Sequence, residues 1–125
     1  MRNYWYALLL FCFFSSCKKN ESNPPSVSIA LPMANDTVYL SDSIRVQATI
    51  TDKNLSTYKI ILYNLYSKAL LYTEVGNASS GSFAIDKKIY FTLNADTTAY
   101  MNVLGVDKNG NTGGAGGQFF IKNNR

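Results

Sequence analysis

The stretch that decides the fold runs Ile44-Arg45-Val46-Gln47-Ala48-Thr49-Ile50-Thr51. Apolar and polar side chains alternate through it without interruption. Successive side chains of a β-strand point to opposite faces, so this alternation predicts a strand with one buried face. The four apolar side chains, those of Ile44, Val46, Ala48 and Ile50, are expected to face inward.

Six further stretches have the composition and length of short strands. They cover residues 27–31, 58–63, 69–75, 88–93, 100–106 and 118–122. Clusters of Asn, Asp, Ser and Gly separate them and are typical of turns. No stretch shows the 3.6-residue periodicity of an amphipathic helix. Seven short strands in about 100 residues predict an all-β fold, a seven-stranded antiparallel immunoglobulin-like (Ig-like) β-sandwich.

A glycine-rich segment precedes the last of these strands. Residues 113–117 read GGAGG and lack the Gly-Lys-Ser/Thr ending of a phosphate-binding loop. The segment is therefore predicted to be a flexible loop or a bulge.

Composition limits the classes of function. The chain has 125 residues, enough for one domain, and a formal net charge of +4. Its adjacent basic residues form two pairs, Lys18-Lys19 and Lys87-Lys88, instead of the stripe that nucleic acid requires, so no nucleic-acid partner is expected. The chain has no histidine, which removes the commonest general base and the commonest metal ligand.

The N-terminus has the pattern of a cleavable export signal. Arg2 is followed by an apolar run over residues 4–14, which is too short to span a membrane as a helix. Two small residues then precede Cys17. This pattern predicts a signal peptide over residues 1–16, a tether over residues 17–26 and a folded domain over residues 27–125.

Phe14-Ser15-Ser16-Cys17 resembles a bacterial lipobox, in which the cysteine is lipidated and becomes the new N-terminus. Phe14 departs from the usual Leu, Val or Ile. The aromatic leader followed by Cys-Lys-Lys is similar to lipoproteins of the Bacteroidota type. The resemblance implies a membrane anchor on Cys17, such as palmitate, and Lys18 in place of Asp favours the outer membrane, with the leaflet left open.

Two local motifs are similar to those of Ig-like domains. Residues 96–100 (DTTAY) resemble a tyrosine corner, in which the hydroxyl of the tyrosine, here Tyr100, bonds to upstream backbone. Residues 106–111 (VDKNGN) resemble the hairpin of bacterial Ig-like and cadherin-like surface domains. The resemblance covers residues 25–122 and implies a fold and a surface location, not an activity.

Oxygen-bearing side chains in the predicted turns form a candidate calcium site at Asp52, Asp107, Asn109 and Asn111. The turn itself also explains Asn109-Gly110, because a tight hairpin favours these residues. No other cofactor is expected.

Tyrosines gather in two neighbouring stretches and form a candidate ligand platform. They are Tyr58, Tyr63, Tyr66, Tyr72 and Tyr90. A tyrosine ring can stack on a sugar or a peptide and hydrogen-bond through its hydroxyl. Tyrosine is also common in strands for reasons of packing alone.

These observations favour a non-catalytic binding or adhesion module, held at the membrane by its lipid, with a glycan, peptide or envelope protein as ligand. The alternative is a structural accessory subunit of an envelope complex with no ligand of its own. A small hydrolase that pairs Asp52 with Asp107 is the weakest hypothesis, since histidine and a mature thiol nucleophile are missing. The chain is not expected to be an enzyme.

Overall fold

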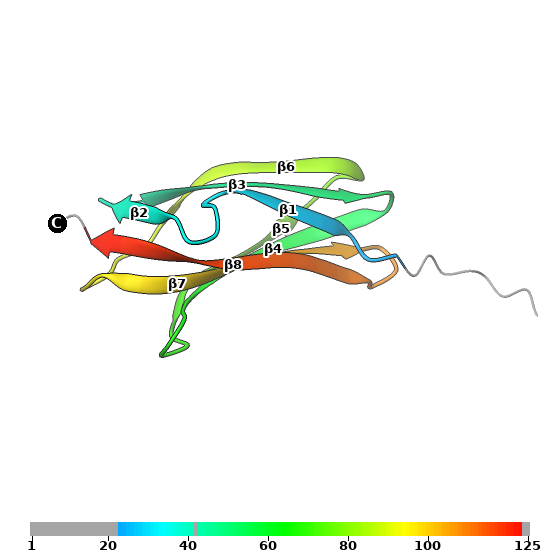
Figure 1. The fold of residues 1–125 in the computed structure, drawn as a ribbon. Coiled ribbons are helices and arrows are strands. Elements are labelled where there is room, and N and C mark those ends of the chain that lie inside the picture. Colours follow the sequence, from blue (N-terminus) through cyan, green and yellow to red (C-terminus); the bar gives the residue numbers. More distant parts are fainter. Residues whose placement is uncertain (1–22, 42, 124–125) are drawn as a thin grey trace, which may run out of the picture.

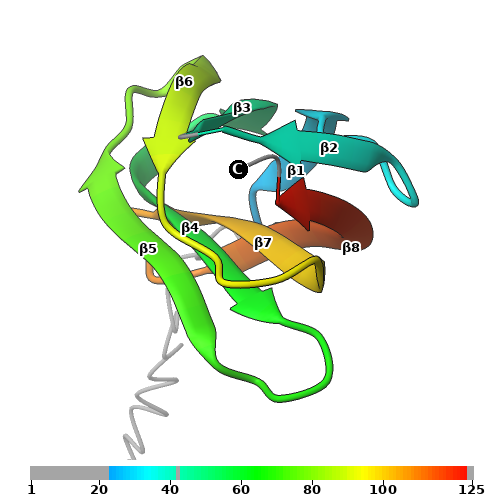
Figure 2. The same cartoon turned by 90° about the vertical axis from the view of Figure 1, so that its left-hand side faces the viewer.

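The computed structural model of the chain describes residues 23–41 and 43–123, and these form two facing β-sheets (Figures 1 and 2). The described residues contain eight strands. They are β1 (Ser26–Leu31), β2 (Thr37–Leu40), β3 (Ser43–Asp52), β4 (Leu55–Asn64), β5 (Leu70–Asn77), β6 (Gly81–Tyr90), β7 (Thr97–Asp107) and β8 (Thr112–Asn123). The predicted all-β fold is confirmed, and the predicted count of seven strands is one too few.

The strand order is that of an Ig-like sandwich. One sheet has the order β1-β3-β6, and the other has the order β2-β8-β7-β4-β5. Immunoglobulin-type sandwiches place strands A, B and E in one sheet and strands C, F and G in the other. Here β1, β3 and β6 lie opposite β4, β7 and β8, while β5 and β2 extend the second sheet at its edges. All neighbouring strands run antiparallel except β2 and β8, which are parallel.

The core lies between the sheets and is formed by alternate residues of the long strands. The inward face predicted for β3 is confirmed, because Ile44, Val46, Ala48 and Ile50 are all buried. They belong to one apolar cluster with residues of β4, β6, β7 and β8. The two sheets therefore share a single core.

Strand β2 lies in a segment for which the sequence predicted no strand. It has four residues, too few to show a period, and Tyr39 within it is 64% exposed. Its position depends on pairing with β8, from Thr37 beside Phe120 to Leu40 beside Asn123. Such a strand is set by a distant partner and not by its own pattern.

Strand β6 covers residues 81–90, whereas the sequence predicted a strand over residues 88–93. It pairs with β3 along its whole length. Its inward positions are Phe83, Ile85, Lys87 and Ile89. The lysine interrupts the apolar series, and this hides the alternation from a sequence-based prediction.

The glycine-rich segment is part of strand β8, so the prediction of a loop or bulge is wrong. Its glycines allow neighbouring groups to approach the strand. A Cβ on Gly113 would lie 1.8 Å from the carbonyl oxygen of Pro25, and one on Gly114 would lie 2.4 Å from Leu104 Cδ2. The segment is thus a regular part of β8, and it requires glycine because neighbouring groups pack closely on both of its faces.

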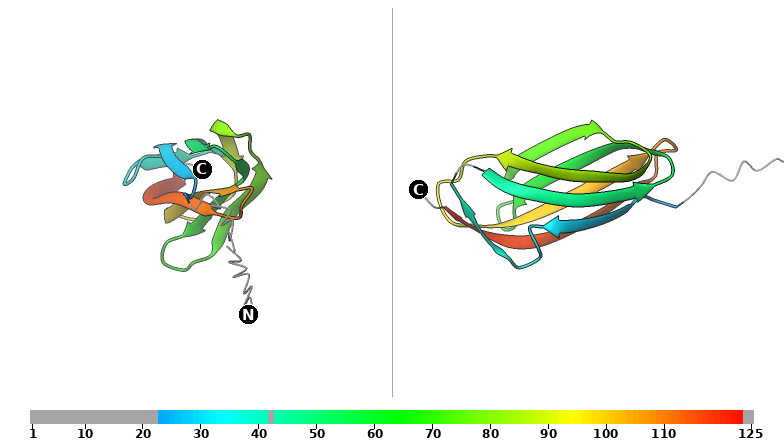
Figure 3. Two further views of the ribbon diagram at one scale, coloured as in Figure 1. Left: turned by 90° about the vertical axis from the view of Figure 1, so that its right-hand side faces the viewer. Right: turned by 90° about the horizontal axis from the view of Figure 1, so that it is seen from above.

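The two ends of the sandwich carry different parts of the chain. β1 begins beside Thr51, at the end that holds the β3–β4 turn and the β7–β8 hairpin. The Lys108 N–H joins these two turns by donating to the Asn54 carbonyl oxygen at 2.8 Å. β8 ends beside Leu40 at the opposite end, where Figure 3 shows the C-terminus. We call the first end the N-proximal pole and the second the C-proximal pole.

Candidate functional site

The five tyrosines predicted to form a platform lie in different places. Tyr58 and Tyr72 point between the sheets toward Glu74. Tyr63 lies on the outer face of the five-stranded sheet. Tyr66 is 79% exposed at the tip of the β4–β5 hairpin, and Tyr90 is 62% exposed at the end of β6 in the other sheet. The structure does not bring the five together on one surface.

Glu74 is the centre of a polar cluster that joins the two sheets beside β5 and β6. Tyr58 Oη donates to Glu74 Oε1 at 2.9 Å, and Tyr72 Oη donates to Oε2 at 2.7 Å. Lys87 of β6 donates to Oε1 and forms an ion pair with it. The Glu74 side chain is only 21% exposed, so the pair is partly shielded from water. We call these four residues the Glu74 cluster.

Burial and hydrogen bonding shift pKa values within the Glu74 cluster. Desolvation pushes the pKa of Glu74 upward, but hydrogen bonds from Lys87, Tyr72 and Tyr58 outweigh it and leave this pKa below its ordinary value. Desolvation and the hydrogen bond to Glu74 raise the pKa of Tyr72 to about 12. The polar groups of Tyr58 and Tyr72 are thus engaged in holding the sheets together and do not form a ligand platform.

Tyr63 of β4 and Tyr100 of β7 form an aromatic pair on the outer face of the five-stranded sheet. They are direct cross-strand neighbours, with ring centroids 5.4 Å apart and ring planes 28° apart. A Cβ on the nearby Gly116 would lie 2.7 Å from the Tyr100 hydroxyl oxygen and 2.3 Å from Asn102 Oδ1. The glycine therefore lets both side chains lie over β8. We call Tyr63, Tyr100 and Asn102 the aromatic face.

The β4–β5 hairpin places a positive charge beside the aromatic face. Lys68 Nζ lies 5.7 Å from the centroid of the Tyr63 ring, within the range of a cation–π contact. Asn64 organises this hairpin, because its Oδ1 accepts hydrogen bonds from the N–H groups of Tyr66 and Ser67 at 2.9 and 3.0 Å. The Lys68 N–H donates to the Asn64 carbonyl oxygen at 2.9 Å, and Lys68 has a φ of 63°.

The aromatic face has the chemistry of a contact surface. Its two rings are half-buried, so each keeps a part exposed to solvent. A ring face stacks on sugars and on apolar or planar side chains, and a neighbouring amide and ammonium supply hydrogen bonds to polar groups of the same ligand.

Tyr100 does not form the tyrosine corner that was predicted over residues 96–100. Tyr100 sits between the buried Ala99 and Met101 and faces outward onto Tyr63. Asp96 Oδ1 instead accepts a hydrogen bond from the Asn123 N–H at 2.9 Å, which ties the start of β7 to the end of β8. The prediction relied on the spacing from Asp96 and ignored the alternation of β7. That alternation was the signal that could have identified Tyr100 as an outward residue.

Asp107 has its carboxylate engaged in the β7–β8 hairpin. Its Oδ1 accepts hydrogen bonds from the N–H groups of Asn109 and Asn111 at 2.8 and 2.9 Å, and its Oδ2 accepts one from Asn111 Nδ2 at 2.9 Å. Desolvation acts to raise the pKa of Asp107, but these hydrogen bonds prevail and lower it. The residue is also buried, so it acts as an internal brace of the turn.

The other candidate acid, Asp52, lies at the same N-proximal pole but in a separate turn. Its Oδ1 accepts a hydrogen bond from the Asn54 N–H at 2.7 Å. Each aspartate thus braces its own turn, Asp52 through Asn54 and Asp107 through Asn109 and Asn111. Across residues 23–41 and 43–123, no group of three or more His, Cys, Asp or Glu side chains is placed to hold a metal ion.

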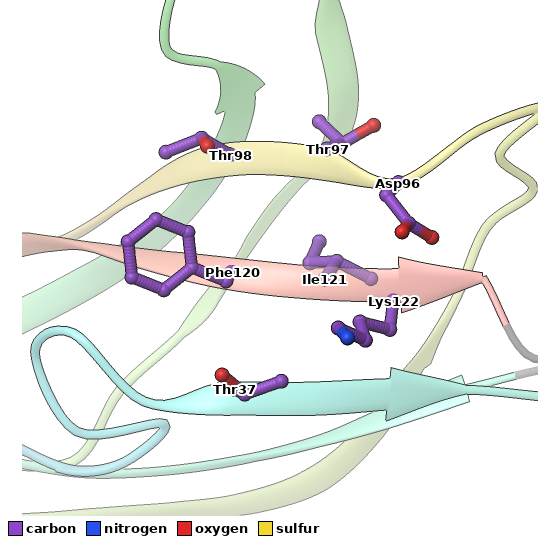
Figure 4. Close-up of a pocket in the computed structure, with 7 residues that line it drawn as sticks. All are labelled: Thr37, Asp96, Thr97, Thr98, Phe120, Ile121 and Lys122. Atoms are coloured by element: carbon purple, nitrogen blue, oxygen red, sulfur yellow. The ribbon is translucent and has the colours of Figure 1, made fainter.

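A shallow pocket of 270 Å³ opens at the C-proximal pole (Figure 4). Its lining residues are Thr37, Asp96, Thr97, Thr98, Phe120, Ile121 and Lys122. Figure 4 shows Asp96 and Lys122 at one end and the Phe120 ring at the other. Thr97 Oγ1 donates to the Ala95 carbonyl oxygen at 3.0 Å. The sequence could not reveal this pocket, because Thr37 reaches it through the unpredicted pairing of β2 with β8.

The predicted lipidation site, Cys17, lies outside the described residues. Within the part of the chain that the structure describes, no helix is long and apolar enough to cross a membrane.

The sequence matches no protein-family model and no curated protein. Among solved structures, murine CRIg matches with a TM-score of 0.45 and 9% sequence identity, over 82% of this chain and 100% of that chain. A likeness at this level carries no argument about ligand or activity. The assignment of an Ig-like sandwich therefore rests on the strand order described above.

Proposed function

We propose that this protein is a lipid-anchored envelope protein whose Ig-like domain acts as a non-catalytic binding or adhesion module. The observation that carries the proposal is the aromatic face, where the Tyr63 and Tyr100 rings stack, Tyr100 lies over Gly116 of β8, and both rings remain partly exposed. An open surface of this kind suits a glycan, a peptide or a partner protein as ligand. The Asp52 and Asp107 carboxylates are engaged in turns, which argues against the hydrolase hypothesis.

The proposed anchor is a lipid on Cys17, and the proposed location is the outer membrane of the cell envelope. Pro25 is buried, and its carbonyl oxygen packs over Gly113, so the domain begins at the N-proximal pole. Tyr63 is near the end of β4 and Tyr100 near the start of β7, in the half toward the C-proximal pole. With the lipid on Cys17, the aromatic face therefore lies in the half of the domain farther from the membrane.

Paired variants of the full chain test the aromatic face. Tyr63→Ala together with Tyr100→Ala removes both rings, and we expect it to abolish retention of envelope glycan or protein in a pull-down. The matched control is Tyr66→Ala with Tyr90→Ala, which removes two exposed tyrosines outside this face. Equal loss in both double variants, or no ligand retained by the unaltered chain, would contradict the proposal.

The anchor and its location need a separate test in intact cells. Cys17→Ser is expected to abolish incorporation of labelled palmitate and to move the chain out of the membrane fraction. Protease treatment of intact cells then reports the side of the outer membrane. Digestion places the domain at the cell surface and favours adhesion, and protection places it in the periplasm and favours the accessory-subunit alternative.

A further inference from the structure

The outer face of the five-stranded sheet presents positive charge. Among the residues of its five strands, the charged side chains that alternate outward are Lys59 of β4 and Lys122 of β8. The acidic residues of these strands, Glu74 and Asp107, turn inward. Lys68 of the β4–β5 hairpin adds a third positive charge, beside the aromatic face. A ligand that lies on these strands therefore meets lysine ammonium groups and no strand carboxylate.

The carboxylates of the domain are already engaged elsewhere. Within residues 23–41 and 43–123, each carboxylate accepts at least one hydrogen bond from the domain itself. They belong to Asp36, Asp52, Glu74, Asp86, Asp96 and Asp107. Lys122 shares the pocket of the C-proximal pole with Asp96 (Figure 4). Lys59 and Lys68 make no ion pair with any of these described carboxylates, so their charges are available to a ligand.

These two lysines flank the aromatic face along the direction of β4. On one side, Lys68 Nζ lies 5.7 Å from the centroid of the Tyr63 ring. On the other side, the outward residues of β4 after Tyr63 are Ile61, which pairs with Asn102, and then Lys59. Four residues of strand separate Lys59 from Tyr63, a distance of about 13 Å. The rings thus have one ammonium group beside them and another farther along the same strand.

We propose that the aromatic face binds an acidic polysaccharide. A sugar ring stacks on Tyr63 and Tyr100, and carboxylate or sulfate groups of the same chain pair with Lys59 and Lys68. Because the two lysines flank the rings, a chain that repeats its acidic group can contact both. This ligand class deepens the proposed function and rests on it.

The groups of the aromatic face match those of a sugar chain. A tyrosine ring offers an apolar face and a hydroxyl, and the Asn102 amide both donates and accepts hydrogen bonds, as the hydroxyl groups of a sugar do. Such a surface, with aromatic rings and a few placed polar groups, fixes a ligand by shape and by hydrogen bonds together. The lysines then select a sugar chain that carries negative charge.

Other polyanions fit this face less well. An extended peptide adds to an unpaired strand edge, but β4 and β7, which carry the aromatic face, are each paired on both sides. A nucleic acid carries a phosphate on every nucleotide and is held by several basic residues in a row, whereas neutral residues separate Lys59 from Lys68 here. The spacing of the two lysines therefore favours a sugar chain.

Binding of the purified full chain, in a non-ionic detergent, to immobilised polymers tests this proposal. The acidic polymers are dextran sulfate and polygalacturonate, and their neutral counterparts are dextran and methyl-esterified polygalacturonate. We expect each acidic polymer to be bound about tenfold more tightly than its neutral counterpart. Lys59→Gln together with Lys68→Gln is expected to weaken binding of the acidic polymers about tenfold.

The matched control is Lys88→Gln together with Lys108→Gln, which removes the same charge from two exposed lysines outside this face. This variant is expected to bind as the unaltered chain does, and circular dichroism checks that every variant folds. Equal binding of acidic and neutral polymers, equal loss in the two lysine variants, or no binding of either acidic polymer overturns the proposal.

Competition experiments separate the sugar chain from other polyanions. Poly-glutamate, single-stranded DNA and phosphatidylglycerol vesicles are each added to the chain bound on dextran sulfate. We expect free dextran sulfate to displace the chain at a lower concentration of negative charge than any of the three. More effective displacement by one of them assigns the face to a peptide, a nucleic acid or a lipid surface and overturns the proposal.

The ligand class and the proposed function can fail separately. If Tyr63→Ala with Tyr100→Ala loses the envelope ligand but Lys59→Gln with Lys68→Gln keeps it, the aromatic face binds a ligand without the acidic groups, and the acidic polysaccharide alone is overturned. If the tyrosine variant also keeps the envelope ligand, the proposed function falls with it.

Discussion

Glu74 of the five-stranded sheet forms an ion pair with Lys87 of the three-stranded sheet. Removing its charge should therefore lower the stability of the whole domain. Glu74→Gln keeps the size of the side chain but leaves Lys87 without its counter-charge. We expect the free energy of unfolding to fall by about 1–3 kcal/mol, because a partly shielded charge loses its partner. Urea denaturation followed by circular dichroism measures this change.

A control for Glu74→Gln is Asp86→Asn. Asp86 pairs with Arg45 at 2.8 Å, but both side chains are at least half exposed. An exposed pair contributes little, so this variant should be much closer to the unaltered chain. If both variants lose the same stability, shielding of the Glu74 cluster is not the cause.

The pH dependence of stability should also identify Glu74. The pKa of Glu74 is lower in the folded chain than in the unfolded chain. Its contribution to the free energy of unfolding is therefore complete above its pKa in the unfolded chain, about 4.3, and is lost as the pH falls through its pKa in the folded chain. The stabilities of the unaltered chain and Glu74→Gln should therefore converge in acid below about pH 4. A constant difference from pH 7 to pH 3 would contradict this account.

Asp107 is expected to stabilise the β7–β8 hairpin without metal. Asp107→Ala removes the acceptor of three hydrogen bonds, so the unfolding midpoint should fall and the amide hydrogens of Asn109 and Asn111 should exchange faster. The unaltered chain should have the same midpoint in millimolar calcium as in excess chelator, since the carboxylate is already engaged. A marked rise with calcium would instead support the calcium site predicted from the sequence.

At the scale of elements, the glycines of β8 test whether close packing requires them. Gly113→Ala would place a Cβ against the backbone of Pro25, which cannot move aside as a flexible side chain can. We expect a loss of about 1–3 kcal/mol in thermal or urea unfolding. Gly117→Ala is the matched control, because its Cβ would lie 3.5 Å from the nearest atom, Ala34 Cβ, and its effect should stay within about 0.5 kcal/mol. The reverse order would refute the role given to Gly113.

The strands that could be predicted are those whose own residues alternate. The buried face of β3 could be predicted directly from the sequence, and the predicted strands over residues 58–63 and 100–106 fall within β4 and β7. β6 was misplaced because an inward lysine finds its partner on another strand. β2 depends on pairing with β8, which is far away in the sequence, and no local pattern records such pairing. The start of β8 pairs with the adjacent β7, but its run of glycines has no apolar alternation that would mark it as a strand.

The candidate site was harder to predict than the fold. Tyrosine content indicated a possible platform, yet Tyr58 and Tyr72 are engaged by Glu74 and Tyr100 was assigned elsewhere. Which tyrosines share a face depends on strand register, because a shift of one residue reverses every side chain. The aromatic face could therefore be assembled only after β4, β7 and β8 were aligned.

At the scale of the whole molecule, both sheets contribute to one core, and no described segment has a core of its own. We expect the domain to unfold in a single cooperative transition. Far-UV circular dichroism and tyrosine fluorescence should then give coincident curves. Separate transitions would mean that the edge formed by β5 and β6 opens before the rest, and Glu74→Gln should widen the separation.

The position of β1 at the N-proximal pole also has a mechanical consequence. If the chain is held by Cys17 and grips a ligand at the aromatic face, tension enters at Ser26 and leaves near the opposite pole. The pull then runs along the length of β1 and of its antiparallel neighbour β3, so the hydrogen bonds between these strands are loaded together in shear instead of being broken one at a time. A fold arranged in this way resists force along the direction in which an anchored adhesion module is stretched.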